Sequence, residues 1–97
     1  MENRVKLNDL RGCFEAAKAA KANYIAVAIE TRGSDELETI INPRANFEGK
    51  QAYYEKAYND DLVLKTFDGI RITRFCHGNT FAELEALLNY EEERDYE

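Results

Sequence analysis

The sequence has few of the residues on which most metal and covalent chemistry depends. It contains one histidine, His77, and two cysteines, Cys13 and Cys76. These three residues match no zinc-ligand spacing, because Cys13 lies far along the chain from the other two. Neighbouring side chains in a strand point to opposite faces, which argues against Cys76 and His77 acting as a thiolate–imidazole pair. We therefore expect no metal and no cofactor, and two reduced, buried thiols.

Other catalytic signatures are also missing. The dipeptide Gly49-Lys50 has no preceding glycine at the spacing of a phosphate-binding loop. Adjacent carboxylates such as Asp60 and Asp61 occur in polar segments, where carboxylates stay solvated instead of serving as acid and base. From these absences we expect a protein that is not an enzyme.

Long apolar runs are absent as well. No stretch approaches the roughly 20 residues that a helix needs to cross a bilayer. The first ten residues, MENRVKLNDL, lack the apolar centre of a signal peptide. The sequence thus predicts a cytoplasmic protein that does not enter a membrane.

Acids outnumber bases, and most of the net negative charge comes from one end of the chain. The 97 residues carry a net charge of −6. Residues 91–97 hold five acids against one base, and the remainder holds 14 acids against 12 bases. Binding to bulk DNA or RNA needs many cations and is not expected. We expect one domain over residues 1–90, with one modest core, and an acidic, frayed tail over 91–97.

The first half of the chain has clear periodicity. Apolar residues recur at helical spacing from Leu7 to Ala20 and predict a helix over 8–22, with Lys18 and Lys21 near its end. Residues 24–31 alternate and predict a strand. The strand has isoleucine and valine on one face and small alanines on the other, and the alanine face could meet solvent, a helix or another subunit. A turn over 32–35 leads to a second strand over 37–42.

The second half is predicted to contain another helix and a second hairpin. Asn42-Pro43 ends the second strand, and Asn46 is placed to cap a helix over 47–58. Asp68-Gly69 is a strong signal for a two-residue hairpin between strands over 62–67 and 70–77. That register pairs Phe67 with Ile70, Lys65 with Ile72, and Val63 with Arg74. Thr80 to Glu83 form a capping box, which predicts a third helix ending near Tyr90.

The predicted order of elements is α-β-β-α-β-β-α. Paired strands separated by helices are typical of an α+β fold. We expect a four-stranded, mostly antiparallel sheet with helices packed against at least one face. Two arrangements are open at this point, because the two hairpins can share a sheet within one chain or complete it across a dimer.

Aromatic, amide and basic residues gather in the crossover between the two hairpins. Aromatic rings can stack on bases, and cations, amides and a helix N-terminus can hold phosphates. The alternative is that the aromatic residues are core and the cations are ordinary surface residues. The candidate ligand-binding residues are Asn42, Arg44, Asn46, Phe47, Lys50, Tyr53 and Tyr54, with Lys65, Arg71 and Arg74 added by the second hairpin.

Several short motifs between residues 41 and 81 resemble a family of small, uncharacterised phage and prophage proteins of Gram-positive bacteria. The motifs are an Ile-Asn-Pro turn at 41–43, Asn-Phe at 46–47, Tyr-Tyr at 53–54, Ala-Tyr-Asn-Asp at 57–60, Leu-Lys-Thr-Phe at 64–67, Phe75, and Gly-Asn-Thr-Phe at 78–81. The likeness covers most of the chain from Leu7 to Leu88. It implies a phage accessory protein, such as a counter-defence factor, that acts by stoichiometric binding in the cytoplasm of a host bacterial cell.

Two functions are consistent with this resemblance. The first is sequestration of a nucleotide immune signal, which predicts a homo-oligomer because so short a chain has little room for a closed pocket. The alternative is an acidic inhibitor of a host defence or nucleic-acid-processing protein, acting through the tail or through an exposed sheet edge or face.

Overall fold

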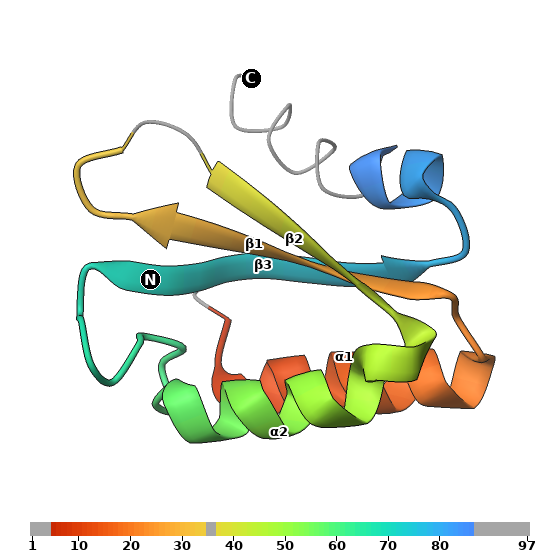
Figure 1. The fold of residues 1–97 in the computed structure, drawn as a ribbon, viewed down its shortest axis with the longest axis horizontal. Coiled ribbons are helices and arrows are strands. Elements are labelled where there is room, and N and C mark those ends of the chain that lie inside the picture. Colours follow the sequence, from red (N-terminus) through yellow and green to blue (C-terminus); the bar gives the residue numbers. More distant parts are fainter. Residues whose placement is uncertain (1–4, 35–36, 87–97) are drawn as a thin grey trace.

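Two helices lie against one face of a three-stranded antiparallel sheet in the computed structural model, which describes residues 5–34 and 37–86 (Figure 1). A third helix begins at residue 81, and its described part reaches residue 86. The predicted α+β class is confirmed. The bounds of the other elements, in chain order, are α1 Leu7–Ala20, β1 Tyr24–Thr31, β2 Leu37–Pro43, the 3-10 turn η1 Arg44–Asn46, α2 Phe47–Ala57 and β3 Ile70–Gly78.

Helix α1 forms where the helical spacing of apolar residues predicts it. Its buried stripe consists of Leu7, Leu10, Phe14 and Ala17. The helix ends at Lys21, which adopts a left-handed conformation with φ of 57°. The backbone N–H of the next residue, Ala22, then donates to the carbonyl of Ala17 at 2.9 Å. This closing turn satisfies carbonyls that a helix end otherwise leaves unpaired.

Strand β1 is the centre of the sheet, whose strand order is β2-β1-β3. Its isoleucine and valine side chains belong to the core between the sheet and the helices, and Ala26 and Ala28 are buried on the other face. The third helix lies on that other side (Figure 1). Its residue Phe81 has its ring centroid 4.9 Å from that of Tyr24. A helix therefore covers one end of the alanine face.

The segment after α2 is a loop, so the predicted second hairpin and four-stranded sheet are wrong. Residues 58–69 make only isolated bridges, between Tyr58 and Leu64 and between Val63 and Arg71. The Asn59 Oδ1 atom accepts hydrogen bonds from the backbone N–H groups of Asp61, at 2.9 Å, and Val63, at 3.0 Å. Such bonds from a side chain to the backbone compete with strand formation. The described order of elements is α-β-β-α-β-α.

Leu62 shows why this loop does not extend into a strand. It adopts a left-handed conformation with φ of 62°, and its side chain is fully buried in the core. The predicted Asp68-Gly69 turn also differs, because neither residue has the positive φ that a two-residue hairpin needs. Gly69 nevertheless lies in a turn, because the Ile70 N–H donates to the Phe67 carbonyl at 3.3 Å. The exposed ring of Phe67 lies against it. A Cβ atom there would lie 2.7 Å from the ring of Phe67.

Helix α2 runs antiparallel to α1 and shares its core. The ring of Phe14 meets that of Phe47 edge-on at 6.0 Å and that of Tyr54 at 6.1 Å. The expected cap by Asn46 is wrong, since its side chain makes no capping hydrogen bond. The 3-10 turn leads directly into the helix and leaves Asn46 at φ −101° and ψ 1°, outside the extended conformation of a side-chain cap.

The third helix starts as the sequence predicts. The Thr80 Oγ1 atom accepts a hydrogen bond from the backbone N–H of Glu83 at 3.1 Å, and the Glu83 carboxylate accepts one from the N–H of Asn79. The predicted end of this helix near residue 90 and the predicted acidic tail over 91–97 lie outside the described residues. Within the described part of the chain, no helix combines the length and apolarity needed to cross a membrane.

Candidate functional site

Three of the ten predicted site residues are buried. Asn42, Phe47 and Tyr54 each expose 2% or less of their surface. Phe47 and Tyr54 pack against Phe14 between the helices and the sheet. Their aromatic faces are therefore occupied by the core and are not available to stack on a base.

Among the described residues, the buried Tyr54 hydroxyl has no hydrogen-bond partner of good geometry, although the Asn42 side chain lies close to it. Burial raises its pKa, and the Asn42 side chain lowers it by a smaller amount. Asn42 itself donates a long hydrogen bond of 3.4 Å to the carbonyl of Ile25. Both polar side chains lie inside the fold, and the Asn42 side chain joins β2 to β1.

Lys50 and Tyr53 form a second, separate group on α2. The Lys50 ammonium lies 5.6 Å from the centre of the Tyr53 ring, and Tyr53 is 50% exposed. Gln51 and Glu55 contact α1 from the same helix, through Lys18 and Arg11. At 100° per residue, Lys50 and Tyr53 lie on the opposite flank of α2. An exposed ring is thus present, away from the cleft between α1 and α2.

The remaining cations of the predicted site lie elsewhere. Arg71 and Arg74 are on β3, on the sheet face that carries the alanines, because their register partners are Glu30 and Ala28. Lys65 is exposed in the loop, where its N–H donates to the carbonyl of Ala57. The ten residues consequently do not form one cluster, and a binding role for the whole set stays a prediction.

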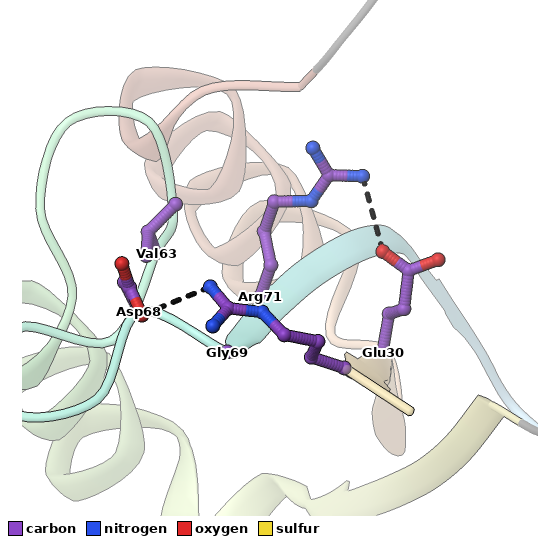
Figure 2. A pocket seen from close by; sticks show the side chains of 6 residues that line it. Glu30, Val63, Asp68, Gly69 and Arg71 are labelled. Atoms are coloured by element: carbon purple, nitrogen blue, oxygen red, sulfur yellow. Dashed lines mark hydrogen bonds and ion pairs between the residues drawn. The ribbon is translucent and has the colours of Figure 1, made fainter. Parts of the chain in front are cut away.

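Arg71 lines a hollow of about 330 Å³ where the end of β1 meets the start of β3 (Figure 2). Its guanidinium points toward Glu30, with an N–O distance of 3.3 Å. Arg32 forms a second ion pair with Asp68, at 3.0 Å. Val63 and Gly69 complete the lining. Both cations already have a carboxylate partner, so this hollow has no surplus charge for an anionic ligand.

A second hollow, which we call the basic groove, has such a surplus. It has a volume of about 380 Å³ and lies where the end of α1 meets η1 and the start of α2. Three cations and one carboxylate line it. Because Lys18 also pairs with Glu15, just outside the lining, one positive charge remains in excess within a chain of net charge −6. The lining residues are Lys18, Lys21, Arg44, Ala45, Phe47 and Glu48.

Neutral groups hold the arginine of the basic groove in place. The Arg44 Nε atom donates to the carbonyl of Ala22 at 3.2 Å, and its terminal nitrogen donates to the Asn23 side chain. The Arg44 backbone N–H donates to the carbonyl of Asn23 at 2.9 Å. Because these acceptors carry no formal charge, the guanidinium is positioned without being neutralised.

The two lysines of the groove come from the end of α1. The Lys18 ammonium donates to Gln51 Oε1 at 2.7 Å and lies 3.7 Å from the carboxylate of Glu15. Lys21 occupies the left-handed position that ends the helix, and its ammonium makes no hydrogen bond or ion pair with any described residue. Lys21 therefore has the ammonium group most available to a ligand.

The groove is suited to holding an anion. The positive end of the α2 dipole adds to the field of the three cations. The last carbonyls of α1, which carry the opposite partial charge, already accept hydrogen bonds from the N–H groups of Lys21 and Ala22. A phosphate or carboxylate group would receive charge-assisted hydrogen bonds there.

Both thiols are also unsuited to nucleophilic chemistry near neutral pH. Cys13 and Cys76 are free and half-buried. Burial, and to a smaller extent the charge of Cys76, raises the pKa of the Cys13 thiol to about 11. Burial also raises the pKa of Cys76. The thiolate, which is the reactive form, is thus scarce at both positions.

Sequence reasoning identified Arg44, Asn46 and Phe47 at or beside the groove but missed its two lysines. Lys18 and Lys21 were interpreted as cations that complement the dipole of α1, a common role near a helix end. Placing them in the groove requires knowing that α1 and α2 pack antiparallel, because this packing brings the end of α1 to the start of α2.

Comparisons with protein-family models, with curated proteins and with solved structures found no match to this chain.

Proposed function

We propose that this protein is a non-enzymatic binding protein that holds a phosphate-bearing, nucleotide-type ligand in the basic groove. The observation that carries the proposal is a hollow of about 380 Å³ in which Arg44 and Lys21 have no carboxylate partner among the described residues. That volume lies in the range of small-molecule sites, about 300–1,000 Å³. The six lining residues include no histidine, cysteine, serine or threonine, and this composition favours holding a ligand over transforming it.

The groove supports the phosphate part of such a ligand more strongly than the base. Arg44 and Lys21 supply donors for phosphate oxygens, whereas Phe47, the one aromatic residue of the lining, is almost completely buried. Tyr53 is exposed on the other flank of α2. We therefore expect affinity to depend on the number of phosphate charges and on salt, with little discrimination between bases.

The biological setting follows from the resemblance to phage and prophage proteins. In that setting the ligand is a nucleotide signal of bacterial immunity, and the protein lowers its free concentration in the host cytoplasm. The alternative, an acidic inhibitor that uses the tail against a host protein, involves residues 91–97, which lie outside the described part of the chain.

Thermal shift and calorimetry with matched ligands test the proposal. The panel contains a nucleoside, its mono- and diphosphate, a cyclic dinucleotide and ADP-ribose. A ligand that binds only the folded state stabilises it, by about 2.7 kcal/mol at a concentration of 100 Kd. We expect stabilisation by the phosphate-bearing compounds, increasing with phosphate charge and decreasing with salt. Failure of every phosphate compound to bind, or equal binding of the nucleoside, would refute the proposal.

Lys21→Gln is the sharpest variant, because the side chain makes no contact that the fold needs. It should weaken phosphate binding about tenfold, since a hydrogen bond to a charged group contributes about 1.5–3 kcal/mol. Arg44→Gln should weaken binding at least as much, with some loss of stability from its contacts to Ala22 and Asn23. The matched control is Lys56→Gln, an exposed cation outside the groove, which should leave binding unchanged.

A further inference from the structure

The two outer edges of the sheet differ in how far other backbone covers them. The outer edge of β3 is partly covered by the loop, because the N–H of Leu64 donates to the carbonyl of Ile70 and the N–H of Ile72 donates to that of Leu62, both at 2.9 Å. A register shift also interrupts the pairing of β3 with β1 between Ala28 and Ile29. Covering loops and bulges are two of the devices by which proteins prevent an edge strand from pairing with another chain.

The outer edge of β2 has neither device. The seven residues of β2 pair with β1 without a register shift. Within residues 5–34 and 37–86, no backbone group beyond β1 hydrogen-bonds to this strand. Its centre, Thr39-Ile40-Ile41, consists of β-branched residues, which favour strands. Glu38 is the one charge in the strand, and Pro43 lies at its very end. The backbone edge is thus an open template.

We propose that β2 pairs antiparallel with β2 of a second copy of this chain, forming a continuous six-stranded sheet across a two-fold axis. The strand is self-complementary when Ile40 lies on the axis, because all seven residues then overlap. Residues that face each other share a side of the sheet, so Thr39 meets the partner's Ile41 and Glu38 meets the partner's Asn42. The two Glu38 carboxylates do not face each other, so this register avoids repulsion between like charges. The β-branched pairs at its centre stabilise the sheet.

An apolar strip next to this edge supports the same interface. Ile41 is 38% exposed on the alanine face, diagonally across from Tyr24. Tyr24 contacts Phe81 of the third helix, and Phe81 is 60% exposed. The strip continues from β1 toward the open edge, where a second copy would shield it from water. This inference rests on the β2 edge and is independent of ligand binding in the basic groove.

Sedimentation equilibrium and light scattering from about 1 to 100 μM test the proposal with the full chain. We expect a monomer–dimer equilibrium within that range. Thr39→Lys and Ile41→Glu should each raise the dimer Kd about tenfold or more, because each puts a charge opposite a partner residue that cannot pair with it. The Thr39→Lys, Ile41→Glu double variant places opposite charges across the axis and should recover much of the lost affinity.

Controls separate the interface from general effects. Ala52→Lys adds the same charge on an exposed part of α2 and should not alter the dimer. Thermal unfolding at low concentration verifies that each variant folds. Hydrogen exchange adds a second measurement, since the amides of residues 37–42 that point away from β1 should become more protected as concentration rises. A chain that remains monomeric throughout, or dimerises equally in both single variants, would overturn the proposal, as would a dimer with unprotected β2 amides.

Discussion

Asn59 organises the loop that replaces the expected strand, so its substitution should have a large effect for an exposed residue. Its Oδ1 atom accepts two backbone hydrogen bonds, from Asp61 at 2.9 Å and Val63 at 3.0 Å. A typical hydrogen bond contributes about 0.5–1.5 kcal/mol. Asn59→Ala removes both acceptors and buries no new surface, so it should lower the free energy of unfolding by about 1–2 kcal/mol, below the simple sum because the site is partly solvated.

Asn59→Asp is the matched comparison. A carboxylate oxygen can accept the same two hydrogen bonds, so this variant should stay within about 0.5 kcal/mol of the parent protein. Urea titration monitored by circular dichroism measures both values, and a loss of 1 kcal/mol corresponds to about 4–8 °C in Tm for a domain of this size.

Local exchange measurements complete the test of the Asn59 interaction. The amide protons of Asp61 and Val63 should exchange faster with solvent in Asn59→Ala and remain protected in Asn59→Asp. If the alanine variant is as stable as the parent, the two hydrogen bonds do not hold the loop. If the aspartate variant loses as much as the alanine variant, an effect other than the lost acceptor is responsible.

Two further predictions concern buried tyrosines. Tyr54→Phe removes a buried hydroxyl that has no hydrogen-bond partner of good geometry within residues 5–34 and 37–86, so the free energy of unfolding should be unchanged or higher by up to about 1 kcal/mol, as measured by urea titration. A decrease in the free energy of unfolding of more than about 1 kcal/mol would show that the hydroxyl has a stabilising partner. Burial raises the pKa of Tyr58 from 10.0 to about 12. Folding thus favours its neutral form, and the stability from this group is fully present below pH 10 and is lost between pH 10 and 12. Tyr58→Phe should flatten that part of the stability–pH curve.

Apart from the expected cap at Asn46, residues 5–34 and 37–57 follow their local patterns closely. The stripe of α1 has Leu10 and Phe14 four residues apart, and the alternation in β1 separates Val27 from Ala26 and Ala28 without ambiguity. A periodic segment of this kind buries its apolar face whatever it packs against. The local sequence is therefore enough to predict whether it forms a helix or a strand. Helix α2 is found in the same way from Phe47 and Tyr54.

The segment over 62–67 could not be predicted by the same reasoning. Its apolar residues suit a strand, but Asn59 captures two backbone N–H groups and Leu62 turns its side chain into the core from a left-handed conformation. Gly69 lies in a turn, closed by the hydrogen bond from the Ile70 N–H to the Phe67 carbonyl at 3.3 Å, but this turn lacks the positive φ that the Asp-Gly pair indicated. Both effects depend on contacts that the local pattern does not contain.

The basic groove was only partly predictable for a related reason. Arg44 and Phe47 are close to each other in the chain, so their proximity is visible in the sequence. Lys18 and Lys21 join them only because α1 and α2 pack antiparallel, with Lys18 bonded to Gln51. The aromatic rings that suggested base stacking were taken up by the core, which is the common fate of large apolar side chains in a small domain.

Because β1 is the central strand, one of its edges stays unpaired until β3 has been synthesised. Its partners in β2 follow at once, but its partners in β3 lie 39 to 54 residues further along. At about 5–20 residues per second, β3 leaves the ribosome roughly 2–10 s after β1. Throughout that interval the most apolar strand of the protein has one unpaired edge, a condition that favours aggregation. The arrival of residues 70–78 is thus the step that closes the sheet on that side, and a chain interrupted before Ile70 keeps this edge of β1 exposed.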